Sequence, residues 1–309
     1  MKILFFDDWK LGVLKDDATV VDVSDVVKDI PRLGPGDVIN GLIARFGDYR
    51  AKLQDAAAKG KGVPVAGVRI RPPLPKPTNI VAMAVNYMED GTRSEPAPIN
   101  AFHKSSSAII GPAETMVLPD VPATIFEGEA EMAVIIGKKA TRVSQADAMS
   151  YVFGYCNFID GSARGLPPSG NTFYQMKSRD TFAPIGPALV TADEVPDPHR
   201  LQITLSVNGT VKQDFNTSDM AHKIPRCIEW VTSIHTLEPG DILATGTNHR
   251  GLSAFMNGDV IELETERLGR LTFNVRDDLK RTWSRETRLE RQQKGQEGTT
   301  PQLSGKYAK

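Results

Sequence analysis

The sequence predicts an α+β fold that is mostly β, in which a small α/β unit precedes a larger β-rich domain. Two observations lead to this prediction. Between Asn79 and about Trp283, short apolar runs separated by turn signals recur at the length of strands. Two stretches, 38–59 and 218–237, instead repeat apolar residues at helical intervals. At 309 residues, the chain is long enough for one large domain or two.

Residues 1–75 are predicted to form the small N-terminal domain. Its expected strands lie at 3–6, 11–14 and 19–23. The helical stretch 38–59 follows and ends at Gly60. Closely spaced prolines from Pro72 to Pro77 then predict an extended linker to the next domain.

Residues 76–285 are predicted to form the main domain. Its expected strands are Ile80–Val85, Met132–Gly137, Ala188–Thr191, Leu201–Val207, Asp241–Thr245, Asp259–Glu264 and Leu271–Val275. The pair Asn208-Gly209 predicts a hairpin turn. In the stretch 218–237, Pro225 predicts that the regular helix begins there. Residues 286–309 form a polar tail, and we expect its last part, 296–309, to be mobile unless it docks on a partner subunit.

Composition excludes several classes of partner. A formal charge of −1 argues against a broad basic surface for nucleic acid or anionic lipid. The apolar stretches reach about ten residues, too few to cross a bilayer, and the first residues lack a signal-peptide profile. Cys156 and Cys227 lie in apolar contexts without Cys-x-x-Cys spacing, which predicts buried free thiols. We therefore expect a cytoplasmic protein with no nucleic-acid or membrane partner.

The main chemical signal is an acidic cluster that reads Glu-Gly-Glu-Ala-Glu over residues 127–131, just before the apolar run 132–136. In a strand, Glu127, Glu129 and Glu131 point to the same side. Like charges that close repel one another, and a divalent cation with a preference for oxygen ligands would relieve this repulsion. The alternative is a solvated charge cluster, and the pentapeptide alone does not decide between the two.

Three further segments join this cluster in order along the chain. Asp160 ends the apolar run 152–159 and opens an Asp-x-Ser-Ala-Arg motif. Residues 177–187 read Lys-Ser-x-Asp-Thr-Phe-x-Pro-x-Gly-Pro, and residues 239–247 read Pro-Gly-Asp-x-x-x-Thr-Gly-Thr. Together with the Glu-x-Glu pair, these motifs resemble the fumarylacetoacetate hydrolase family over roughly residues 1–283. The resemblance implies a catalytic domain built as a mixed β-sandwich or roll, and a homodimer.

The resemblance also implies a metal site. Glu129, Glu131 and Asp160 occupy the positions that bind a divalent cation in the family, which is Mg²⁺, Mn²⁺ or Ca²⁺. Lys177 matches a lysine beside the metal and the substrate, where an ammonium can offset excess carboxylate charge. Glu127 falls outside the pattern and is interpreted as a surface acid.

Further residues are expected to contact the substrate. Gly246 and Thr247 match a substrate-binding loop, and Tyr87 lies in a segment that matches the family lid. Arg164 has two interpretations that the sequence leaves open. Its guanidinium either pairs with a substrate carboxylate or holds Asp160 or another acid in place.

The general base is where the chain departs from the family pattern. Family hydrolases often carry Asn-Tyr-x-x-His-x-x-Glu on a lid, whereas residues 86–93 place Asp90 at the histidine position and Arg93 at the glutamate position. Glu89 and Asp90 are therefore candidate bases. A second departure places His249 in the loop after Thr247, so we also consider His249 as a replacement base from another part of the chain.

These features support three functional hypotheses. The first is a metal-dependent hydrolase that cleaves a C–C bond in an acylpyruvate-like 2-oxo or 1,3-dicarbonyl acid from aromatic or sugar acid catabolism, through a metal-stabilised enolate. The second keeps the metal and a small 2-oxo acid but assigns a decarboxylase, isomerase, hydratase or lyase, because the lid His/Glu pair is absent. The third is a non-catalytic, metal-stabilised binding protein.

Overall fold

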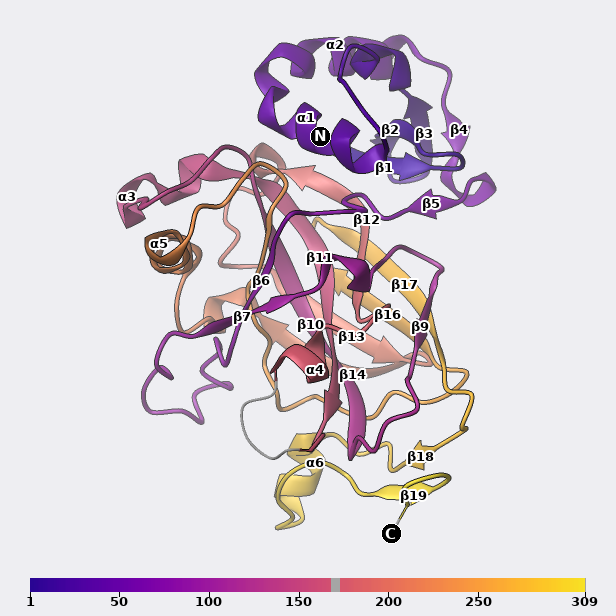
Figure 1. Cartoon of the computed structure of the whole chain (residues 1–309), viewed down its shortest axis with the longest axis vertical. Coiled ribbons are helices and arrows are strands. Elements are labelled where there is room, and N and C mark those ends of the chain that lie inside the picture. Colours follow the sequence, from indigo (N-terminus) through magenta and orange to yellow (C-terminus); the bar gives the residue numbers. More distant parts are fainter. Residues whose placement is uncertain (168–172, 309) are drawn as a thin grey trace.

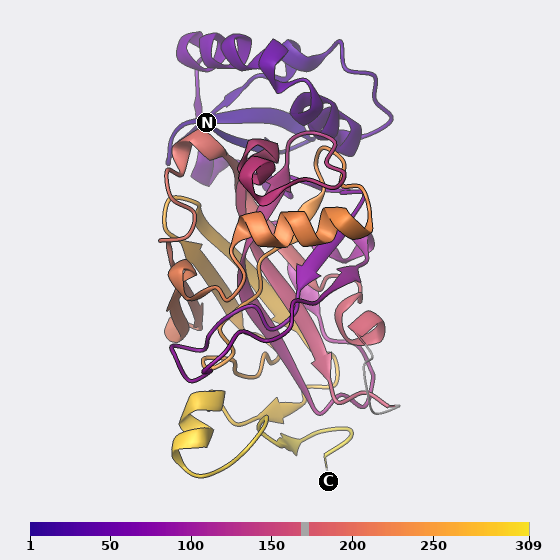
Figure 2. The ribbon, with the colours of Figure 1, turned by 90° about the vertical axis from the view of Figure 1, so that its left-hand side faces the viewer.

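Two β-sheets form most of the protein, as the computed structural model shows for residues 1–167 and 173–308. A twelve-stranded sheet runs in the order β4-β3-β2-β1-β12-β11-β10-β15-β6-β7, with β5 and β8 beside this path, and a five-stranded sheet runs in the order β14-β13-β16-β17-β9. The predicted α+β, mostly β fold is therefore confirmed. The N-terminal unit and the C-terminal segment lie at opposite ends of the long axis (Figures 1 and 2).

The N-terminal unit contributes one end of the large sheet. Its elements are β1 (Lys2–Phe6), β2 (Lys10–Asp16), β3 (Thr19–Asp22), α1 (Pro35–Ala44), α2 (Phe46–Lys59), β4 (Val63–Pro64) and β5 (Ile70–Arg71). The helical stretch that the sequence predicts as one helix is divided at Arg45, whose φ of −120° leaves the helical region. Because β1 pairs with β12, the sheet runs without a break from this unit into the main domain.

The main domain packs its two sheets around a shared apolar core. The large sheet contains β6 (Ile80–Met83), β7 (Ala101–Lys104), β8 (Ile109–Ile110), β10 (Ile125–Ile136), β11 (Val152–Arg164), β12 (Ala183–Thr191) and β15 (Ile242–Ala244). The second sheet contains β9 (Thr115–Val117), β13 (Gln202–Val207), β14 (Thr210–Asn216), β16 (Val260–Thr265) and β17 (Gly269–Arg276). One apolar cluster includes Met132 and Val134 of β10 together with Leu263 and Phe273 of the second sheet.

Local signals in the sequence agree with the main domain. Asn208 and Gly209 join β13 to β14 with φ values of 52° and 76°, as a tight hairpin turn requires. Helix α5 (Ile224–Ile234) has Pro225 in its first turn and lies beside α3 (Gln145–Ala148), as Figure 2 shows from outside. Cys156 and Cys227 are free and buried, as predicted.

The pairing of β10 with β11 places the acidic residues. Its register sets Glu129 opposite Asp160 and Glu127 opposite Ser162. Cross-strand partners lie on the same face of the sheet, so the carboxylates of both strands converge there. The sequence predicts a strand that starts only at Met132, but β10 begins at Ile125, so the acids lie within the strand and not before it.

The C-terminal segment is folded onto its own chain. It contains β18 (Thr282–Trp283), α6 (Arg288–Gln293) and β19 (Gln302–Ser304), and β18 pairs with β19. Thr287 and Glu290 form a capping box that starts α6. Residues 296–309, for which the sequence predicts mobility, include β19 and the Lys306–Asp120 ion pair, and their mobility stays a prediction. Among the described residues, no helix is long and apolar enough to cross a membrane.

We predict that Gly154→Ala will destabilise the main domain. A Cβ atom at Gly154 would lie 2.1 Å from the carbonyl oxygen of Val190 on β12, so β11 would have to move away from β12. Thermal or urea unfolding should show a loss of about 1–3 kcal/mol in the free energy of unfolding. Gly47→Ala is the control, because a Cβ there meets nothing within 4 Å. Equal stability of the Gly154→Ala variant and the wild-type protein would contradict the packing described for these strands.

Candidate metal centre and active site

Three buried carboxylates converge at the centre of the large sheet. Ligand atoms of Glu129, Glu131 and Asp160 all lie within 4.8 Å of one another. Each of the three residues is at most 6% exposed. The register of β10 and β11 brings Asp160 across from Glu129, and the strand pleat adds Glu131 on the same face.

Two lysines neutralise part of this charge. Lys177, at the end of α4 (Phe173–Lys177), donates hydrogen bonds from Nζ to Glu129 Oε2 at 2.7 Å and to Asp160 Oδ2 at 2.6 Å. Lys104, at the end of β7, donates from Nζ to Asp160 Oδ1 at 2.6 Å. Sequence reasoning identified Lys177 but missed Lys104, which belongs to none of the recognised motifs.

The carboxylates have unequal environments. Burial opposes the ionisation of Glu129, but Lys177 and Arg164 outweigh it and hold its pKa well below the usual value. Burial raises the pKa of Glu131 well above the usual value, and the charges of Asp160 and Glu129 raise it further. Among the described residues, Glu131 has no ion pair with a cationic side chain. A cation within the triad would therefore stabilise the ionised form of Glu131 most.

Glu127 is not the surface acid that the sequence predicts. It is fully buried in β10 and forms ion pairs with Arg164 and with Arg288 of α6. Burial raises its pKa, but the two guanidinium groups outweigh burial and hold the pKa below the usual value. The family pattern gives no sign of this pairing, because Arg288 lies beyond the region of resemblance.

Arg164 bridges Glu127 and Glu129. Its Nε donates to Glu127 and its Nη2 donates to Glu129. The sequence leaves open whether Arg164 pairs with a substrate carboxylate or holds an acid of the chain in place. In the structure it contacts two acids of the chain, neither of which is Asp160. Arg164 also lines the site cavity, so its guanidinium remains close to the space for a small ligand.

The Gly-Thr loop after β15 closes one side of the triad. Gly246 has a φ of 85°, a conformation that glycine adopts readily, and its N–H donates to Glu131 Oε2 at 2.7 Å. Thr247 Oγ1 donates to Ala130 O at 2.7 Å. Gln213 of β14 donates to Thr247 Oγ1 at 2.8 Å, which links the second sheet to the site. Gln213 has no motif in the sequence, and its role emerges only from the sheet packing.

His249 and Glu89 form a pair across two loops. The imidazole Nδ1 lies 2.6 Å from Glu89 Oε1, and the backbone N–H of His249 donates to Glu89 Oε2 at 2.8 Å. On the other side of the ring, Nε2 lies 3.8 Å from Glu129 Oε1. Glu89 itself has a left-handed backbone conformation, with φ of 56°. Asp90 points elsewhere, because its carboxylate accepts a hydrogen bond from Arg250 at 3.0 Å.

The site has a small cavity of about 90 Å³. Its lining includes two stacked aromatic rings, Phe102 and Phe173, together with Glu129, Arg164, Lys177, Gly246, Thr247 and His249. Tyr87, an expected substrate contact, does not belong to this lining. It is fully buried and packs edge-on against Phe215.

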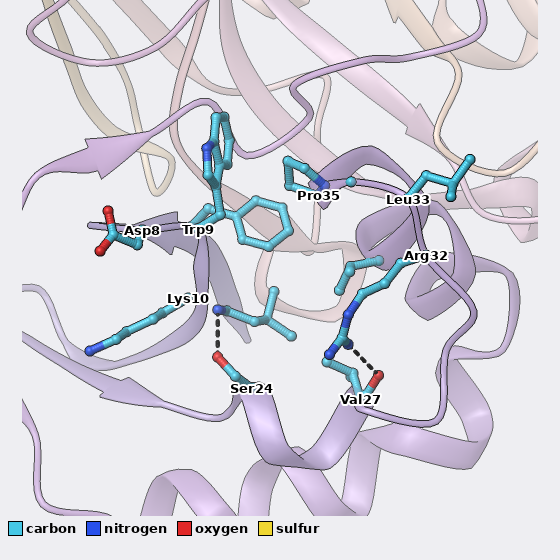
Figure 3. Close-up of a pocket in the computed structure, with 12 residues that line it drawn as sticks. Asp8, Trp9, Lys10, Ser24, Val27, Arg32, Leu33 and Pro35 are labelled. Atoms are coloured by element: carbon cyan, nitrogen blue, oxygen red, sulfur yellow. Dashed lines mark hydrogen bonds between the residues drawn. The ribbon is translucent and has the colours of Figure 1, made fainter.

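A larger cavity of about 450 Å³ lies in the N-terminal unit. Figure 3 shows Trp9, Lys10 and Arg32 among the residues around it, and Ser24 Oγ accepts a hydrogen bond from the backbone of Leu11. Its charged side chains belong to exposed residues and do not converge on a common point. The small cavity beside the triad, where acids, a lysine and an imidazole meet, is therefore the better candidate for chemistry.

The donor set of the triad suits a hard divalent cation. Carboxylate oxygens are the ligands that Mg²⁺ and Mn²⁺ prefer. Each oxygen has two lone pairs, so the hydrogen bonds to lysines and to Gly246 leave capacity for a metal ion. The triad could therefore bind a divalent metal, with Lys177 and Lys104 as neighbouring groups that orient Asp160.

Residues 79–276 match the profile described as fumarylacetoacetate (FAA) hydrolase C-terminal. The chain belongs to this family. Among curated relatives, a maleylpyruvate hydrolase of Aquipseudomonas alcaligenes is 32% identical over 292 residues, which cover 89% of this chain and 99% of the relative. A mitochondrial oxaloacetate tautomerase of Rattus norvegicus is 38% identical over 219 residues, which cover 67% of this chain and 69% of the relative.

A solved structure resembles this family member closely. The maleylpyruvate hydrolase from Sphingobium sp. SYK-6, in complex with manganese(II) ion and pyruvate, aligns with a TM-score of 0.81 and 34% sequence identity. The alignment covers 90% of this chain and 99% of that chain. The relatives thus include enzymes named for hydrolysis and for tautomerisation, which supports an enzymatic role at the level of the family.

We predict that Glu131→Gln and Asp160→Asn will weaken metal binding. Each change removes one charged ligand but keeps the side-chain volume, so the affinity for Mn²⁺ measured by calorimetry should fall by at least about 100-fold. Glu264→Gln is the control, because Glu264 lies on the exposed side of β16 and, within the part of the chain that the structure describes, pairs only with Arg270. Unchanged Mn²⁺ affinity in both triad variants would remove the assignment of the metal site.

Proposed function

We propose that this family member is a divalent-metal-dependent hydrolase that cleaves a C–C bond in an acylpyruvate-like 2-oxo acid. The observation that carries the proposal is the His249–Glu89 pair beside the carboxylate triad. The sequence lacks the histidine and the glutamate at their usual positions in the lid, yet Glu89 of the lid segment and His249 of the loop after Thr247 bring the same two kinds of side chain together. This pair supplies a base where hydrolysis needs one.

The hydrogen bonds of His249 define its chemical role. A carboxylate only accepts hydrogen bonds, so Nδ1 carries the hydrogen that faces Glu89. The neutral ring then has its lone pair on Nε2, which faces Glu129 and the cavity. Glu89 orients the ring and stabilises the imidazolium that forms when Nε2 takes a proton.

The proposed reaction needs one water molecule and two proton transfers. His249 Nε2 removes a proton from water, and the hydroxide adds to the acyl carbonyl carbon. The bond between that carbon and the adjacent methylene breaks, and its electron pair passes to the methylene carbon, which takes the proton back from His249. The products are a carboxylic acid and pyruvate. When bound at Glu129, Glu131 and Asp160, a divalent cation supplies Lewis-acid stabilisation of the negative charge that develops on the 2-oxo oxygen.

The cavity lining fits a small anionic substrate. Lys177 and Arg164 place two positive charges at its wall, and Phe102 and Phe173 supply an apolar surface for an acyl chain. A volume of about 90 Å³ favours a short acid. Gly246 and Thr247 also line the cavity, and the lack of a side chain at Gly246 lets a ligand approach the backbone closely.

We predict that His249→Gln and Glu89→Gln will lower kcat for acylpyruvate hydrolysis. Loss of a general base reduces turnover by about 10²–10⁴-fold, whereas the affinity for Mn²⁺ in calorimetry should change little, since neither residue belongs to the triad. Asp90→Asn is the matched comparison, because Asp90 is the adjacent carboxylate and pairs with Arg250 instead. A loss of turnover in the Asp90 variant as large as in the Glu89 variant would contradict the assignment of the base.

Tautomerisation is the second candidate function. The likeness to oxaloacetate tautomerases favours it, and a single base that moves a proton between carbon and oxygen would use the same His249–Glu89 pair without a water molecule. Proton NMR of the product mixture, recorded after Mn²⁺ has been removed, distinguishes the two reactions. Pyruvate from an acylpyruvate supports hydrolysis, whereas accelerated keto–enol exchange of oxaloacetate without cleavage supports tautomerisation. Absence of both reactions would favour the non-catalytic alternative.

The homodimer implied by the family resemblance remains part of this proposal. Sedimentation velocity of the purified chain should give a single species of about twice the 33.7 kDa chain mass. A single species at the chain mass would contradict it.

A further inference from the structure

The C-terminal segment reaches the site through a line of alternating charges. Arg288 of α6 donates to Glu127 from Nη2 at 2.6 Å and from Nε at 3.2 Å. Arg164 contacts Glu127 through Nε and Glu129 through Nη2, and Lys177 contacts Glu129 on its other oxygen. One surface-proximal arginine is thus connected to the metal-site carboxylates by a series of direct ion pairs.

We infer that Arg288 is a positioning residue for the active site, which acts by holding Glu127 so that Arg164 can contact both Glu127 and Glu129. The inference rests on the proposed function, since it assigns Arg164 to a cavity that binds an anionic substrate. Neither the side chain of Arg288 nor that of Glu127 lines that cavity, so the effect of these two side chains on the reaction passes through Arg164.

Burial explains why Glu127 needs both arginines. Its side chain is 1% exposed, whereas those of Arg164 and Arg288 are 21% and 26% exposed. A buried carboxylate that loses one of two cationic partners draws more strongly on the partner that remains. Without Arg288, the guanidinium of Arg164 would therefore turn toward Glu127 and away from Glu129 and the cavity.

The same segment also holds the loop that carries His249. The backbone N–H of Arg288 donates to Leu252 O at 3.0 Å, and that of Leu289 donates to Arg250 O at 2.8 Å. Arg250 directly follows His249 in the chain. The first turn of α6 therefore contacts the acidic side of the site through its side chain and the imidazole side through its backbone. Arg288 takes part in both contacts.

Steady-state kinetics of the full-length, Mn²⁺-loaded protein test this inference. Arg288→Ala should lower kcat/KM for an acylpyruvate by about 10–100-fold, mainly through KM, because a misplaced binding group costs about that much. Arg288→Lys keeps the charge but loses the contact through two nitrogen atoms, so its kcat/KM should lie between those of Arg288→Ala and the wild-type protein. Lys294→Ala is the control, since Lys294 lies in the same segment and, of residues 1–167 and 173–308, pairs only with Glu286 at the surface.

A double-mutant cycle separates positioning from a purely structural role. In a Glu127→Gln background, Arg288→Ala should cause less than a twofold further loss, because both act on the same contact. Thermal unfolding confirms that each variant is folded. If Arg288→Ala does not fold, Arg288→Lys replaces it in the cycle. Additive losses in the cycle would overturn the inference. It would also be overturned if the kcat/KM of Arg288→Ala, or that of Arg288→Lys, equalled that of Lys294→Ala.

A spectroscopic readout keeps this inference distinct from the proposed function. The side-chain Nε–H resonance of Arg164, assigned by its loss in Arg164→Lys, should shift in Arg288→Ala and stay in place in Lys294→Ala. If the wild-type protein turns over no acylpyruvate, the proposed function fails, and this resonance alone decides the role of Arg288. An unshifted resonance in Arg288→Ala would overturn it.

Discussion

The antiparallel pairing of β10 with β11 is the constraint on which the site depends. Its register sets Glu129 opposite Asp160, and the pleat places Glu127 and Glu131 on the same face. Further along that face, Ala133 and Ile135 are buried in the core with the N-terminal unit, so the same strand changes from a charged to an apolar face. A slip of one residue would bury the wrong side chains along both strands, and the core that fixes the register therefore also fixes the carboxylates.

A buried acidic site of this kind requires matching cations from elsewhere in the fold. Four carboxylates are paired or crowded together at the site, and four cationic side chains reach them: Lys104, Lys177, Arg164 and Arg288. These cations come from β7, α4, β11 and α6, so the site depends on segments far apart in the chain. Removal of a single cation would leave a buried carboxylate with only part of its compensation, which costs more than the loss of a surface ion pair.

The sequence was informative where a signal is local. The Glu-x-Glu pair, Asp160, Lys177 and the Gly246-Thr247 loop were all found from short motifs, and the structure brings them together. Lys104, Gln213 and the burial of Glu127 were missed because each follows from packing between distant segments, to which no local pattern corresponds. His249 and Glu89 were identified only as separate candidates for the base, and their pairing became visible once the two loops met. The contacts of the C-terminal segment are hidden from local patterns for a similar reason, since Arg285 and Arg288 bind acids, Asp259 and Glu127, that precede them by 26 and 161 residues.

The central claim is that the triad and the His249–Glu89 pair act on one bound substrate. Anomalous diffraction from crystals soaked with Mn²⁺ and pyruvate tests it most directly. The account predicts a manganese peak coordinated by Glu129, Glu131 and Asp160, with pyruvate in the cavity between Arg164, Lys177 and the Nε2 atom of His249. A manganese peak at another site, or pyruvate bound away from His249, would contradict it.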